Sequence, residues 1–205
     1  MIRQPLTLPA ILLAVLAVSG CGATTSGLDV RYPEAGVNRS LLASAPPRRV
    51  EITPVVDRRV DTARIGSRPK DGGAIVTSRP VGDIVGEALA VEIRKNGHTI
   101  VSDNKDVVLS GVVEEFRLDV VAGYSATQYV GRVVVALTVA EPRSGDRLLT
   151  RRYVGISRRQ IDNDKDSDNG WRDVMDVALA RTMHDLATDP ELAAVLTRLL
   201  TAFNP

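Results

Sequence analysis

The residues with the most evident chemical potential form an acid-rich run before the last part of the chain. Asp162, Asp164 and Asp166 alternate as the first three oxygen ligands of an EF-hand calcium loop do. That loop also needs glycine at its sixth position and glutamate at its twelfth, where this chain has serine and aspartate. We therefore expect no metal site. The run is interpreted as a solvated loop leading into a helix, with Asn169 as the predicted N-cap.

Two further groups could carry acid–base chemistry. His98 and His184 are the only histidines, and no serine has the glycine pattern of a nucleophile elbow, so a Ser-His-Asp triad is not indicated. Glu114 and Glu115 could serve as the carboxylate pair of a glycosidase, although neighbouring strand residues normally point to opposite faces. We expect a non-enzymatic protein without a cofactor. An envelope glycan hydrolase that uses Glu114 or Glu115 is the alternative.

Composition and charge limit the class of partner. The 205 residues are 44% hydrophobic and 25% charged, which suits one globular domain. With 26 basic and 25 acidic side chains the net charge is +1, which argues against a nucleic-acid partner. Four arginine pairs are interpreted as solvated strand ends, with contact to an anionic envelope polymer or lipid headgroup as the alternative. They are Arg48-Arg49, Arg58-Arg59, Arg151-Arg152 and Arg158-Arg159.

The N-terminal segment predicts export and lipid attachment. Residues 6–18 carry no charge but are too few to span a bilayer, which takes about 20 residues. Val18-Ser19-Gly20 then precedes Cys21, the only cysteine, and this order resembles the lipobox of bacterial lipoproteins. The resemblance implies that residues 1–20 are a signal peptide and that Cys21 is lipidated. Gly22, in place of aspartate, favours the outer membrane, with the inner membrane as the alternative.

The chain after the signal divides into two parts. Residues 21–47 are predicted to be the lipidated cysteine and a flexible tether, because they lack periodic apolar positions. Residues 48–205 are predicted to be a single periplasmic domain. Its expected class is α+β, with an antiparallel sheet of about four to five strands and helices packed on one face. The expected strands are 50–56, 99–101, 107–121, 133–139 and 148–157, and the expected helices are 81–95, 171–187 and one that starts at 190, with a long polar loop over 57–77.

The longest predicted strand contains a fault in its alternation. Apolar residues occupy odd positions from Val107 to Val113 and even positions from Phe116 to Val120. One extra residue restores a single apolar face, so the sequence predicts a β-bulge at Glu114-Glu115.

Several short segments together resemble YajG-type bacterial lipoproteins, over about residues 50–200. The segments are Val55-Val56-Asp57-Arg58-Arg59, Ile65-Gly66, Gly82-Asp83-Ile84-Val85-Gly86-Glu87-Ala88-Leu89, Gly97, Tyr153-Val154-Gly155 and the surroundings of Asp189. The resemblance implies an outer-membrane lipoprotein without catalytic residues.

Within this pattern, Asp57, Arg59, Ile65 and Gly66 are the candidates for a structural or partner-binding role. An aspartate after a strand can accept backbone N–H groups, and an arginine can fork onto carbonyls or a carboxylate across the loop.

The expected function is therefore a membrane-anchored periplasmic lipoprotein that binds or scaffolds. Its expected contacts are the membrane, through lipidated Cys21, and an envelope protein partner. An auxiliary lipoprotein subunit of an envelope transport or assembly machine is a further alternative.

Overall fold

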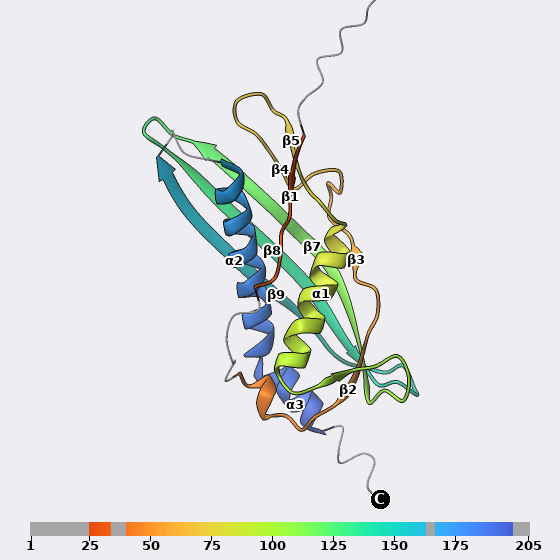
Figure 1. Cartoon of the computed structure of the whole chain (residues 1–205). Coiled ribbons are helices and arrows are strands. Elements are labelled where there is room, and N and C mark those ends of the chain that lie inside the picture. The colour runs from red at the N-terminus through yellow and green to blue at the C-terminus, as the bar shows by residue number, and fades with distance from the viewer. Residues whose placement is uncertain (1–24, 34–39, 163–166, 199–205) are drawn as a thin grey trace, which may run out of the picture.

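The computed structural model describes residues 25–33, 40–162 and 167–198 (Figure 1). Its elements, in chain order, are β1 (Ser26–Leu28), η1 (Leu42–Ser44), β2 (Arg49–Ile52), β3 (Val56–Asp57), β4 (Gly66–Ser67), β5 (Ala74–Thr77), α1 (Val81–Lys95), β6 (Thr99–Ile100), β7 (Val107–Ala122), β8 (Ala126–Ala140), β9 (Arg147–Asp162), α2 (Ser167–Ala187) and α3 (Pro190–Arg198). Mixed helices and open sheets confirm the predicted α+β class. Cys21 and residues 163–166 of the acid-rich run lie outside the described residues.

Three long strands form the centre of the fold. β7, β8 and β9 have 16, 15 and 16 residues and pair antiparallel through two short turns. In β7, the odd-numbered apolar residues before the fault and the even-numbered ones after it are buried on one face. Odd-numbered residues of β8 and β9, such as Val133, Val135 and Tyr153, are buried with them. Figure 1 shows helices α1 and α2 lying over that same face. None of the described helices lies on the opposite face of these strands.

The predicted bulge is confirmed. Val113 pairs with Val135, whereas Glu115 pairs with Val134, so Glu114 is the extra residue. Because the bulge absorbs one position, Phe116 and Leu118 return to the buried face that Val113 occupies.

The first strand of the domain pairs differently from the expectation. β2 lies between β6 and β7 and runs parallel to both, and β3 is also parallel to β7. The physical reason is the connection: the chain crosses over through α1 before it returns as β7, and such a crossover joins parallel strands. The antiparallel prediction holds for the long strands only.

A second, three-stranded sheet of β1, β5 and β4 lies where the sequence predicts a tether and a long loop. Leu28 and Val30, inside the predicted tether, are buried in the core, and so are Ile65 and Ile75 of the predicted loop. The pairing of these short segments brings the four apolar side chains into the core. The described part of 21–47 therefore packs against the domain, unlike a free tether.

Helix α2 approaches the sheet closely at a glycine. A Cβ placed on Gly155 of β9 would lie 1.9 Å from the carbonyl oxygen of Ala178 and 2.4 Å from Oγ1 of Thr182. Only glycine fits between the strand and the helix backbone there. Helix α2 starts at Ser167, so Asn169 lies inside the helix and the predicted N-cap is wrong.

Helix α3 starts where predicted, because Oδ1 of Asp189 accepts the backbone N–H of Glu191 at 2.8 Å. No helix in the described ranges is long and apolar enough to cross a membrane.

Candidate functional site

The four candidate residues after the first strand come together at one edge of β7. β3 pairs with Val112 and Val113, and the backbone N–H of Arg58 donates to the Val113 carbonyl at 2.9 Å. This pairing fixes Asp57 at the end of a strand. The chain then leaves the sheet as a loop over 58–65 and returns to β7 at β4.

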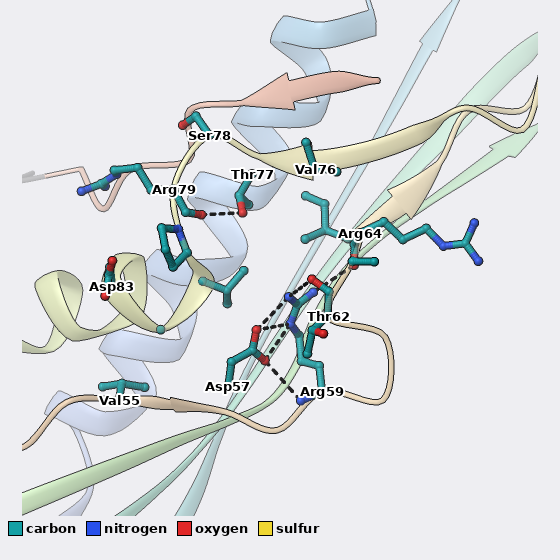
Figure 2. A pocket seen from close by; sticks show the side chains of 15 residues that line it. Val55, Asp57, Arg59, Thr62, Arg64, Val76, Thr77, Ser78, Arg79 and Asp83 are labelled. Atoms are coloured by element: carbon teal, nitrogen blue, oxygen red, sulfur yellow. Dashed lines mark hydrogen bonds and ion pairs between the residues drawn. The ribbon is translucent and has the colours of Figure 1, made fainter. Parts of the chain in front are cut away.

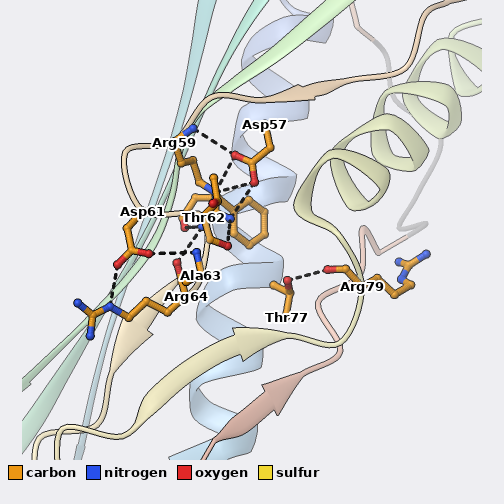
Figure 3. Close-up of polar contacts among 9 residues, drawn as sticks. Asp57, Arg59, Asp61, Thr62, Ala63, Arg64, Thr77 and Arg79 are labelled. Carbon is orange, nitrogen blue, oxygen red and sulfur yellow. Dashed lines mark hydrogen bonds and ion pairs between the residues drawn. The ribbon is translucent and has the colours of Figure 1, made fainter.

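Arg59 folds back into that loop and closes it. Its side chain is only 6% exposed and donates to both carboxylate oxygens of Asp57, at 2.8 to 3.2 Å. It also donates to the carbonyls of Arg64 at 3.0 Å, Thr62 at 3.4 Å and Phe116 at 3.4 Å (Figure 3). One planar guanidinium thus joins the strand end, the loop and β7. We call Asp57 and Arg59 the loop clamp.

The protonation of Asp57 follows from these contacts. Partial burial acts to raise the pKa of its carboxyl group, but hydrogen bonds from the Arg59 side chain and backbone N–H, together with the Arg59 charge, outweigh it. The pKa of Asp57 therefore lies below its ordinary value. The carboxylate is charged at neutral pH and is engaged by its partner, so it offers no free general base.

A cavity of about 490 Å³ adjoins the loop clamp, between the end of β5, the start of α1 and the loop. Figure 2 shows the clamp on its wall, while the guanidinium groups of Arg64 and Arg79 extend away from it on opposite sides. These two arginines pair with Asp61 at 2.7 Å and Glu87 at 2.6 Å. The positive charges near the cavity are thus already matched by carboxylates.

Ile65 and Gly66 connect the two sheets. The backbone N–H of Ile65 donates to Ile75 at 2.8 Å, and its carbonyl accepts from Leu118 of β7 at 2.7 Å. A Cβ on Gly66 would lie 2.3 Å from the Leu118 carbonyl oxygen. The position therefore requires glycine for close backbone approach, which gives these two residues a structural reason to be present.

A larger groove, about 1210 Å³, lies between the 58–67 loop and the helix-free face of the long strands. Both candidate glutamates line it. Glu114 pairs with Arg152 at 2.6 Å, and Glu115 pairs with Arg132 at 2.8 Å. Each carboxylate thus faces an arginine, and the groove combines ion pairs with valine side chains.

Two buried polar contacts escaped the sequence interpretation. Arg48, expected at a solvated strand end, is buried and donates from Nε to the Leu196 carbonyl at 2.7 Å and from Nη2 to the Thr197 carbonyl at 3.1 Å. It therefore caps the end of α3. Arg59 is likewise not solvated. The solvated-end interpretation is wrong for these two arginines.

The second missed contact is Glu92, which is fully buried in α1. Its carboxylate accepts from the hydroxyl of Tyr32 and from Nδ2 of Asn96 at 3.0 Å, and Lys95 Nζ lies 3.4 Å away. The signal was available, because residue 92 follows Ala88 and Leu89 at helical spacing. This contact holds the N-terminal segment against α1.

Comparison with solved structures gives a likeness in fold. A Xanthomonas campestris protein of family DUF330 superposes with a TM-score of 0.56 at 13% identity, covering 89% of this chain and 100% of that one. The likeness is one of fold alone. A minor lipoprotein from Acinetobacter baumannii aligns with a TM-score of 0.39 at 16% identity, covering 75% of this chain and 92% of that one.

No family model matches the chain. No curated protein matches it either. The resemblance to YajG-type lipoproteins therefore stays a prediction.

Proposed function

We propose that this chain is a lipid-anchored envelope protein whose single α+β domain acts by binding or scaffolding rather than by catalysis. The observation that carries the proposal is the order of Val18-Ser19-Gly20-Cys21 behind an uncharged stretch. A diacylglycerol thioether and an acylated amine on Cys21 would anchor the protein durably, since each buried CH₂ contributes about 0.8 kcal/mol. Gly22 favours the outer membrane.

The helix-free sheet face is the proposed binding surface for an envelope protein partner. It combines exposed Val154 and Val121 with the arginine–glutamate pairs of the groove. Apolar side chains interspersed with paired charges suit a protein contact. The ion pairs at Glu114 and Glu115 favour this role over hydrolysis, because a glycosidase needs one protonated carboxyl group and one free carboxylate. A subunit role in a transport or assembly machine fits the same surface.

Labelling in cells tests the anchor. The wild-type protein should incorporate labelled palmitate and fractionate with the outer membrane, whereas Cys21→Ser should take up no label. Absence of label in the wild type contradicts the proposal. Photocrosslinking from position 154, with position 177 on α2 as the control, tests the binding surface. Capture of the same partner from both positions would contradict a specific role for the open face.

A further inference from the structure

The point where the chain joins the folded domain is well defined. Ser26, at the start of β1, pairs with Ile75 of β5, and Nη1 of Arg68 lies 3.4 Å from its hydroxyl. The chain therefore enters beside the β4–β5 turn over residues 68–73. Figure 1 shows this turn at the same end of the molecule as the β7–β8 turn over 123–125. We call this the hairpin end.

The distance from that point to Cys21 is short. Three residues, 22–24, lie between Cys21 and Thr25, where the described chain begins, so their Cα atoms are four chain steps apart. An extended chain spans at most about 3.6 Å per residue, so the reach is about 14 Å. A tether over 21–47 would allow a far longer reach. Because β1 and the buried residues after it belong to the domain, only this short stretch remains between the anchor and the fold.

The hairpin end also carries side chains that suit contact with a membrane surface. Tyr124 at the β7–β8 turn is fully exposed, and Val121 beside it is 55% exposed. Tyrosine favours the boundary between water and lipid, where its ring is covered and its hydroxyl stays wet. The opposite end of the sheet has the β8–β9 turn over 141–146, which contains Glu141, Arg143 and Asp146. The 15 residues of β8 place the two turns about 50 Å apart.

The charges at the hairpin end indicate whether anionic lipid would attract it. The β4–β5 turn at the hairpin end carries Arg68, Lys70 and Asp71, and Arg68 pairs with Asp71 at 2.5 Å. Two basic side chains and one acidic side chain leave this turn a net charge of only +1, too little for strong attraction to anionic lipid. Contact at this end therefore depends on the short connection and on Tyr124 rather than on a basic patch.

We propose that the hairpin end of the domain lies on the bilayer surface, with Tyr124 at the lipid–water boundary and the β8–β9 turn pointing away from the membrane. This inference rests on lipidation of Cys21. It orients the molecule so that the long strands extend from the membrane and the groove on the helix-free face opens to the side.

The test uses the full lipidated chain in phosphatidylcholine vesicles. Cys21 is the only cysteine and its sulfur is consumed by the lipid, so Ser125→Cys, which keeps Tyr124, and Ser144→Cys each give one labelling position. Each variant carries an environment-sensitive fluorophore, and the vesicles contain a headgroup nitroxide quencher. We expect several-fold stronger quenching at position 125 than at position 144. Adding phosphatidylglycerol should not strengthen it.

Two outcomes overturn the proposal in distinguishable ways. Protein that floats with the vesicles but shows equal quenching at both positions, or more at 144, is anchored in a different orientation. Protein that does not float lacks the lipid anchor, and the proposed function then fails with this inference. Insertion of a flexible glycine–serine spacer after Gly22 provides the matched control. It should reduce quenching at position 125 while flotation stays intact.

Discussion

The two faces of the long sheet differ in how tightly their residues are constrained. On the covered face, Gly155 touches the backbone of α2, and residues such as Val133 and Val135 are fully buried. On the open face, Val154 is 38% exposed and the charged side chains form pairs that solvent reaches. Adjacent residues on one strand thus have different tasks. The covered face determines stability, whereas side chains on the open face, such as Val154, remain accessible to solvent.

The largest expected difference is between Gly155 and its neighbour. Gly155→Val should destabilise the domain by roughly 3 kcal/mol or more, because its side chain must displace α2 from the sheet. Val154→Ala, on the open face, should change stability by only about 0.5 kcal/mol. Urea melts of both variants measure this. Similar midpoints for the two would show that α2 does not press on β9 as described.

A second comparison lies at the 58–65 loop, where the Asp57–Arg59 pair is largely buried and the Asp61–Arg64 pair is exposed. Asp57→Ala should lower stability by about 1–3 kcal/mol, because it leaves the buried Arg59 guanidinium without its carboxylate. It should also increase proteolysis between Arg64 and Arg79. Asp61→Ala, in the exposed pair, should change little. A normal melt of Asp57→Ala with lost function in cells would instead make the loop clamp a partner-binding site.

The two histidines allow a comparison of how protein stability depends on pH. Nδ1 of His98 accepts the backbone N–H of Arg48 at 3.2 Å, so the folded protein needs the neutral ring. Burial, the largest cause, lowers the pKa of His98 below its ordinary value of about 6.5, and the Arg48 charge adds to this effect. The unfolded chain therefore binds the proton first, and stability should fall as pH drops below about 6.5.

His184 is exposed on α2 and serves as the control for this effect. His98→Gln should flatten the decline in stability between pH 8 and pH 5, whereas His184→Gln should leave it unchanged. Denaturant midpoints at the two pH values measure the difference. An unaltered pH profile in His98→Gln would rule out this histidine as the source.

The smallest effect is expected on the open face. The double variant Glu114→Gln with Glu115→Gln should change stability by about 1 kcal/mol or less, since exposed ion pairs contribute little. The scaffold proposal predicts that the cell envelope tolerates the change as long as the partner is still captured. A strong envelope defect with intact partner binding would support the hydrolase alternative.

Local pattern made much of the fold predictable. The change in parity between Val113 and Phe116 located the bulge, and the spacing of Ile84, Val85, Ala88 and Leu89 located α1. The small sheet was missed, because strands of two to four residues are too short to show a period. The parallel pairing of β2 was also missed, since no local pattern names a distant partner.

Local sequence features also made part of the candidate site predictable. Asp57 and Arg59 were candidates because an aspartate after a strand can accept backbone N–H groups, and an arginine can bind carbonyls or a carboxylate across a loop. Arg48 did not stand out, because the carbonyls that it caps lie nearly 150 residues later in the chain. Whether an arginine is solvated or buried depends on such long-range acceptors, which its neighbours in the sequence do not reveal.

The mass of the mature protein tests the central claim most directly. Protein extracted from membranes and analysed by mass spectrometry should begin at Cys21 and carry a diacylglycerol on its sulfur, with an acyl chain on the new amine. A mature chain that begins elsewhere, or one with an unmodified Cys21, would contradict the lipid anchor and the account built on it.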